Sequence, residues 1–178
     1  PMQIGEPDDI VSVIQDTAAD NKRAFKLANA PIGSGHDNWL KGVIVQFDLQ
    51  YPEYFSQQLQ RYNFVDIISS QSKMHRITSR ELTEGDFTEM VTQDNIDQIN
   101  SFIRAYNSPE LKTEQSHWFD MIISNLPSGY LKWMGISTNY LSLKTIYSQR
   151  RHHKLNEWKE FCSWIETLPM SELITGKR

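Results

Sequence analysis

The stretch GHDNWLKGVIVQFDLQYPEYFSQQLQR, residues 35–61, decides the fold because its hydrophobic period changes within it. From Val43 to Tyr51 apolar and polar residues alternate, and this period of two predicts a half-buried β-strand. Pro52 suits the first turn of a helix, which we expect to run to about Asn63. A short strand over 65–68 and a loop over 69–76 follow. The stretch therefore predicts a short early sheet with a helix after its first strand.

Helical periodicity dominates the sequence on both sides of this stretch. Before it, residues 10–18 carry apolar side chains at helical spacing behind an aspartate that can cap a helix. After it, the apolar stripes predict four helices, over 96–106, 111–122, 142–150 and 155–165. We therefore expect an α+β fold, with a small mixed or antiparallel sheet and a helical second half, and not an alternating βαβ plan.

The length of the chain fits a single domain over residues 1–178. Its 178 residues are 39% hydrophobic, which is enough apolar material for a core. Within this domain we expect four parts: an N-terminal helix and loop (1–35), a strand, a helix and a polar loop (36–80), an acidic variable segment (81–97) and a helical part (98–178).

Composition and charge exclude several classes of protein. The net charge of −4 gives no basic excess for non-specific binding to nucleic acid. The chain has no apolar run of about 18 residues, and its first residues lack the basic start and apolar core of a secretory signal. The lone Cys162 excludes an internal disulfide. We expect a cytoplasmic protein without a membrane span.

A metal site is not predicted. His152 and His153 are adjacent, and neighbours on a helix diverge by about 100°, so they are poor joint ligands. No cysteine or carboxylate stands at metal-ligand spacing from them. The basic segment 150–153 is better interpreted as an exposed helix end.

Polar residues around the strand are stronger candidates for a binding site. Gln58 and Arg61 are three residues apart, which places both on one face of the predicted helix. Arginine offers a rigid fork for phosphate, and glutamine can both donate to and accept from the edge of a nucleobase. His36 in a Gly-rich loop, and Asn139 and Arg150 beside apolar helix faces, are further candidates.

Together these residues resemble the flavin-dependent thymidylate synthases, which make dTMP with FAD in place of a catalytic cysteine. In that family a His precedes a strand, and a following helix carries Gln-x-x-Arg. This helix leads into a signature of Arg-His-Arg, seven residues, Ser, one residue and Arg. The chain has the family's spacing, without a gap, at His36, Pro52, Gln58 and Arg61.

A second segment, LPSGYLKWMGISTNYLSLKTIYSQRRHHKLNEW (126–158), extends the resemblance. It reproduces the family's Leu-Pro, eleven residues, Asn, ten residues, Arg pattern through Asn139 and Arg150. The resemblance therefore covers the chain from roughly His36 to Trp158. It implies the fold of that family.

The signature itself is altered. Arg61 keeps its first arginine, but Tyr62 replaces the histidine and Asn63 the second arginine. Gln71 takes the serine position beside Ser72, and Lys73 replaces the last arginine, which keeps the charge and loses the fork. By resemblance, the flavin side is lined by His36, Arg61, Tyr62, Asn63 and Asn139. The nucleotide side is lined by Gln58, Gln71, Ser72, Lys73 and Arg150.

The resemblance implies an enzyme of pyrimidine metabolism that methylates C5 of dUMP, with FAD as cofactor and methylenetetrahydrofolate as co-substrate. Arg150 would be the catalytic residue, since it would hold the pyrimidine edge and stabilise the charge that develops there. The resemblance also implies a homotetramer with sites shared between subunits.

The altered signature leaves the question of catalysis open. Each charge-assisted hydrogen bond lost on the flavin side is worth about 1.5–3 kcal/mol. One alternative is a non-catalytic relative, a pseudoenzyme that still binds a nucleotide. Another is a protein-interaction module, such as a phage inhibitor of a host defence, that uses the acidic segment 81–97 on a protein partner.

Overall fold

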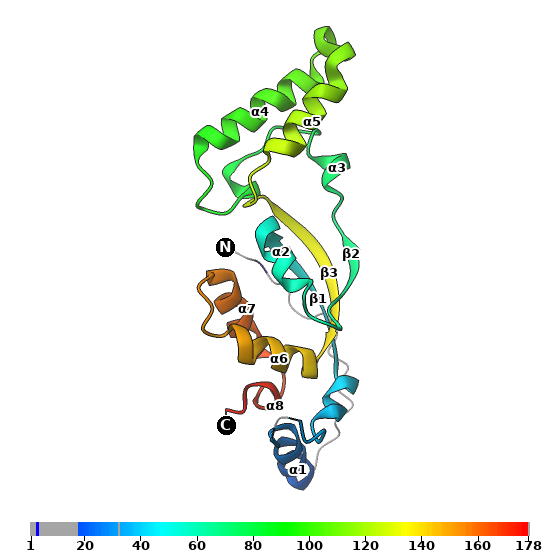
Figure 1. Cartoon of the computed structure of the whole chain (residues 1–178), viewed down its shortest axis with the longest axis vertical. Helices are drawn as coiled ribbons and strands as arrows, with labels where there is room; N and C mark the ends of the chain where they lie inside the picture. The colour runs from blue at the N-terminus through cyan, green and yellow to red at the C-terminus, as the bar shows by residue number, and fades with distance from the viewer. Residues whose placement is uncertain (1–2, 4–17, 32, 178) are drawn as a thin grey trace.

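An antiparallel sheet forms the centre of the computed structural model, which describes residue 3, residues 18–31 and residues 33–177. Among these residues the sheet has three strands: β1 (Ile44–Pro52), β2 (Asp66–Ser70) and β3 (Leu131–Asn139). β3 lies between the other two (Figure 1). β1 pairs with β3 along its whole length, with Ile44 opposite Asn139. A small antiparallel sheet with helices confirms the predicted α+β class.

Helices lie against one face of the sheet and continue beyond both of its ends (Figure 1). In chain order, the described α-helices are α1 (Ala18–Ala28), α2 (Glu53–Leu59), α3 (Lys73–Arg76), α4 (Gln93–Asn107), α5 (Gln115–Asn125), α6 (Tyr140–Arg150), α7 (Asn156–Thr167) and α8 (Glu172–Thr175). The 3₁₀ helices are η1 (Asn38–Gly42), η2 (Glu84–Asp86) and η3 (Pro109–Glu114). The α4–α5 hairpin stands at one end of the molecule and α1 at the other, so the molecule is elongated.

The main core fills the space between the sheet and helices α2, α6 and α7. Val45, Phe47 and Leu49 of β1 are buried, whereas the residues between them are exposed, as the alternation predicts. Trp158 of α7 is fully buried, and its ring centroid lies 4.5 Å from that of Phe55 in α2. The strand–helix unit is therefore fixed by burial of one face of each element.

A second core holds the α4–α5 hairpin at the end of the sheet. Ile96, Ile99 and Ile103 of α4 are buried against Ile122 of α5. Phe87 joins this core beside Tyr130, which stands just before β3. The second core therefore supports both the acidic segment and the beginning of β3.

Several expected boundaries are wrong. α2 ends at Leu59 and not near Asn63, and a turn follows it up to Phe64, which has a left-handed φ of 61°. The expected loop 69–76 contains the short helix α3. The part 98–178 is not wholly helical, because it contains the central strand β3. Of the helix expected within residues 6–29, the structure describes α1 (Ala18–Ala28), and residues 6–17 lie outside the described residues.

No helix in the described ranges is both long enough and apolar enough to cross a membrane.

Candidate functional site

A pocket of about 360 Å³ lies where the turn after α2 meets the start of α6; we call it the turn pocket. It is lined by Lys41, Arg61, Tyr62, Asn63, Phe64, Asn139, Leu141, Ser142, Thr145 and Gln149. Arg61, Tyr62, Asn63 and Asn139, all predicted for the flavin side, therefore meet in one pocket. His36 does not line this pocket, since it is exposed in the loop before η1.

The turn that forms this pocket is held by hydrogen bonds from β3 and α6. Thr138 Oγ1 donates to the carbonyl oxygen of Phe64 at 2.7 Å, and Ser142 Oγ donates to that of Asn63 at 3.3 Å. The buried Asn139 side chain accepts from the Ser142 N–H at 3.0 Å, which caps α6. Asn139 therefore stabilises the pocket wall as well as lining it.

The charge of the turn pocket suits an anion. Lys41 and Arg61 are its two cations, and none of its lining residues is acidic. Amides and hydroxyls of the lining residues add neutral hydrogen-bonding groups, while Phe64 and Leu141 offer apolar surface. An anionic ligand that also carries a ring system fits this set of side chains.

Arg150 lies beside the turn pocket, at the end of α6. Its Nε donates to the Tyr62 phenol oxygen at 2.6 Å, and its Nη1 donates to Gln58 Oε1 at 3.4 Å. Its guanidinium carbon lies 4.8 Å from the centroid of the Trp158 ring, within the range of a cation–π interaction. The Trp158 indole N–H also donates to Gln58 Oε1, at 2.8 Å. The fold therefore brings Gln58 and Arg150 together from positions 92 residues apart.

The other residues predicted for the nucleotide side form a separate group. Gln71 pairs with Trp133 through two hydrogen bonds, of 2.9 and 3.3 Å. Ser72 is exposed before α3, and Lys73 lies 3.9 Å from the Glu53 carboxylate. Glu53 opens α2 and Gln58 lies near its other end, and the helix is about 10 Å long. Within the described part of the chain, no hydrogen bond or ion pair joins Gln71, Ser72 or Lys73 to Gln58 or Arg150.

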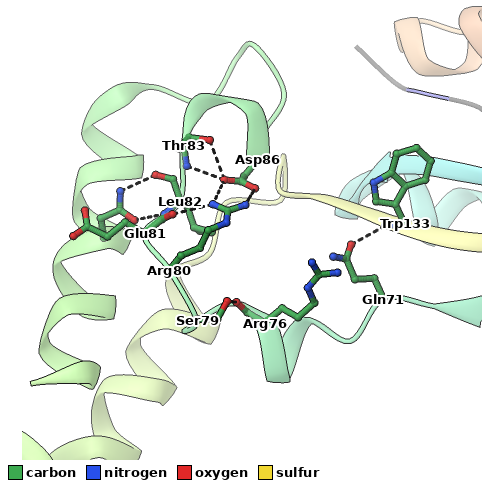
Figure 2. A network of polar contacts seen from close by, with 10 residues as sticks. Gln71, Arg76, Ser79, Arg80, Glu81, Leu82, Thr83, Asp86 and Trp133 are labelled. Atoms are coloured by element: carbon green, nitrogen blue, oxygen red, sulfur yellow. Dashed lines mark hydrogen bonds and ion pairs between the residues drawn. The ribbon is translucent and has the colours of Figure 1, made fainter.

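A smaller pocket beside Gln71 has a volume of about 210 Å³; we call it the arginine pocket. It is lined by Gln50, Gln71, Arg76, Ser79, Arg80, Leu82, Gly85, Asp86, Tyr130, Leu131 and Trp133. Arg76 at the end of α3 and Arg80 in the segment after it both line this pocket, and Figure 2 shows their side chains. Sequence reasoning did not predict Arg76 or Arg80 as site residues. The one available signal was the basic character of residues 73–76.

A third pocket, of about 560 Å³, lies on the acidic segment. Its lining includes Glu84, Glu89 and Gln93, together with Gln50 of β1. No residue predicted for the flavin or nucleotide side lines it. Within the described ranges, no group of three or more His, Cys, Asp or Glu side chains could hold a metal ion.

The similarity of this chain to known proteins lies in its fold. No family model matches the chain, and no curated protein sequence matches it. Two structures of thymidylate synthase X (ThyX) from Helicobacter pylori, each with FAD and dUMP, match with a TM-score of 0.66 at 16% identity. Each match covers 89% of this chain and 82% of the ThyX chain.

A second enzyme has the same fold. The UMP/dUMP methylase PolB from Streptomyces cacaoi, bound with 5-Br UMP, matches with a TM-score of 0.59 at 15% identity over 99% of this chain and 94% of its own. At such identities the likeness establishes the fold. The chain therefore has the fold of ThyX and PolB, as the spacing of its motifs predicts.

Proposed function

We propose that this protein binds a pyrimidine nucleoside monophosphate such as dUMP. The observation that carries the proposal is the contact between Gln58 and Arg150, beside a turn pocket lined by Arg61, Asn63 and Asn139. The guanidinium fork and the glutamine amide suit the carbonyl oxygens and the N–H of a pyrimidine edge. Gln71, Ser72 and Lys73 are proposed for the sugar-phosphate part of the nucleotide.

The turn pocket is the proposed position of FAD. Lys41 and Arg61 fit its phosphates, Phe64 and Leu141 fit an apolar ring, and Tyr62, Asn63 and Asn139 add polar groups. His36 would reach the flavin from the loop before η1. Bound there, a reduced flavin would supply the hydride that converts a one-carbon unit at C5 of dUMP to a methyl group, with methylenetetrahydrofolate as the proposed donor of that unit. Arg150 is then the catalytic residue, because its charge stabilises the negative charge that develops on the pyrimidine.

A homotetramer with shared sites is part of this proposal. Gln58 and Arg150 lie at one end of α2 and Lys73 lies beside Glu53 at the other, so the proposal assigns the two groups to sites that a neighbouring chain completes. On and before β2, three large apolar side chains are exposed: Phe64 by 62%, Ile67 by 44% and Ile68 by 58%. Exposed apolar side chains so close together in the sequence fit an interface between protein chains.

A second candidate function is a non-catalytic nucleotide-binding protein. The engagement of Arg150 by Tyr62 favours it, because a bound pyrimidine must compete with the phenol for the guanidinium. Tyr62 and Asn63 also lack the charges that the family signature supplies for flavin. A protein-interaction module acting through segment 81–97 is a third candidate, and its support is the 85% exposure of Met90 there.

Two measurements on the purified protein test these candidates. First, FAD and dUMP are added and the protein is passed through gel filtration; the enzyme hypothesis expects visible flavin absorption to elute with it. Second, melting is followed with dUMP alone. A ligand present at about 100 times its Kd stabilises the native state by about 2.7 kcal/mol.

The variant Arg150→Gln should lose the melting shift, whereas Arg151→Gln, its exposed neighbour, should keep it. A protein that binds dUMP and no flavin is the non-catalytic relative. If neither ligand binds, the proposed function is wrong.

A further inference from the structure

Arg76 is an exposed arginine at the end of α3 whose guanidinium points into the arginine pocket, toward the Gln71 side chain (Figure 2). Within the described part of the chain, no carboxylate lies at ion-pair distance from it. The guanidinium is therefore oriented toward a cavity without a charged partner. Arginine is the side chain best suited to bidentate recognition of phosphate.

Arg80, the other arginine of the pocket, is already engaged. Its Nη1 and Nη2 donate to the two carboxylate oxygens of Asp86 at 2.8 and 2.6 Å, and Nη1 also donates to the carbonyl oxygen of Glu81 at 2.8 Å. Asp86 accepts further hydrogen bonds from the N–H and the hydroxyl of Thr83 (Figure 2). Asp86 therefore compensates the charge of Arg80, and the charge of Arg76 is left uncompensated.

The protonation states of the Asp86 carboxyl and the Tyr130 phenol support this charge balance. Burial alone raises the pKa of the Asp86 carboxyl, but the hydrogen bonds from Arg80 and Thr83 outweigh it and leave the pKa below its usual range. Asp86 is thus ionised at neutral pH. Burial raises the pKa of the Tyr130 phenol, so that it stays protonated and remains a neutral donor in the pocket wall.

The size of the pocket limits what it can accept. Its volume of about 210 Å³ is below the roughly 300–1,000 Å³ of pockets that enclose a whole drug-sized ligand. It matches a phosphate group with part of a sugar. Gln71 and Tyr130 supply neutral hydrogen-bonding groups around such an anion, whereas the Ser79 hydroxyl already donates to the Arg76 carbonyl oxygen at 2.7 Å.

We propose that the arginine pocket binds the phosphate group of the nucleotide and that Arg76 is its principal charged ligand. Arg76 lies three residues after Lys73, outside the signature positions, and supplies the fork that Lys73 lacks. The assignment of this phosphate to a nucleotide rests on the proposed function. The phosphate site can be tested without it, because inorganic phosphate has the same chemistry.

The experiment is isothermal titration of the full chain with inorganic phosphate, with dUMP and with deoxyuridine. It compares the native protein with Arg76→Gln and with the matched control Arg151→Gln, whose arginine lines neither the turn pocket nor the arginine pocket. We expect Arg76→Gln to weaken the binding of phosphate and of dUMP by about ten- to hundredfold. The binding of deoxyuridine and the melting temperature should be unchanged. Arg76→Lys keeps the charge without the fork, so its affinity for phosphate and dUMP should lie between those of the native protein and Arg76→Gln.

The outcomes separate this inference from the proposed function. If inorganic phosphate binds through Arg76 and dUMP does not bind, the phosphate site is supported and the proposed nucleotide function is wrong. If dUMP binds the native protein and Arg76→Gln with equal affinity, the phosphate site at Arg76 is wrong and the proposed nucleotide function is supported. A native protein that binds no inorganic phosphate also overturns the site.

Discussion

The phenol oxygen of Tyr62 accepts a hydrogen bond from Arg150 Nε at 2.6 Å, and the two residues are 88 positions apart in the chain. Tyr62 stands where the resembled family has a histidine. It also lines the turn pocket and donates to Gln149 Oε1 at 3.1 Å. One substituted residue therefore contacts both the proposed flavin side and the arginine proposed to hold the pyrimidine.

Tyr62→Phe should release Arg150 while keeping the aromatic ring beside Trp158. We expect the free energy of unfolding to fall by about 1–2 kcal/mol, because the hydrogen bonds of the phenol to Arg150 and to Gln149 are both lost. Binding of dUMP should strengthen by up to about fivefold, since the phenol no longer competes for the guanidinium. Urea denaturation and titration with dUMP measure the two effects. The control is Tyr106→Phe, which removes a hydroxyl beside the second core. Weaker binding of dUMP by Tyr62→Phe would show that the phenol does not compete with the nucleotide for Arg150.

Asn100→Leu should destabilise the protein through the segment that carries the arginine pocket. The buried Asn100 amide accepts from the Leu82 N–H at 2.7 Å and donates to the Leu82 carbonyl at 2.9 Å. An apolar side chain leaves both backbone groups unpaired, and each costs about 1–3 kcal/mol. The exposed neighbour Gln98→Leu should change the stability by less than about 0.5 kcal/mol. Equal stability of the two variants in urea denaturation would show that water replaces the Asn100 hydrogen bonds.

Asp86→Asn should give a stability difference that depends on pH. The folded-state pKa of Asp86 is lowered, so its contribution to stability is present above the unfolded pKa of about 3.9 and is lost as the pH falls through the folded value. We expect the variant to be less stable than the native protein at neutral pH. The difference should shrink steadily below about pH 4. Denaturation curves at several pH values measure it, and a difference that stays constant to low pH contradicts the Asp86–Arg80 ion pair as its origin.

Gly135→Ala should disturb the pairing of β2 with β3. A Cβ at Gly135 would lie 2.5 Å from Ser69 Oγ and 3.3 Å from Ile68 Cγ1. Ser69 Oγ also accepts from the Gly135 N–H, at 3.2 Å. Overpacking of this kind costs about 1–3 kcal/mol. Ser69→Gly should restore part of the loss in the double variant. Purely additive losses in a double-mutant cycle would show that the clash is relieved elsewhere.

Hydrophobic alternation predicted β1 correctly because only one face of that strand is buried. The same signal is absent from β3, where Met134, Gly135 and Ile136 are consecutive buried residues and side chains of both neighbouring strands lie over Gly135. Its sequence therefore does not alternate. The turn residues at 127–129 were its only boundary signal, and they were interpreted as the end of a helix. The sheet was thus predicted without its middle strand.

The candidate site was partly predictable for a similar reason. The spacing of motif residues was enough to select Gln58 and Arg150, and the structure brings them into contact. Spacing could not indicate that Tyr62 would occupy the Arg150 guanidinium, since a hydrogen bond between α6 and the turn after α2 depends on tertiary packing. Arg76 was missed because its importance depends on where α3 places it relative to Gln71 and Tyr130.

Calorimetric titration of the native protein and of Arg150→Gln with dUMP asks whether Arg150 holds a pyrimidine nucleotide. We expect saturable binding to the native protein, about tenfold or more weaker binding to Arg150→Gln, and unchanged binding to Arg151→Gln. Absence of dUMP binding to the native protein, or equal affinity in the native protein and Arg150→Gln, would contradict the proposal that this fold presents a pyrimidine nucleotide site at Arg150.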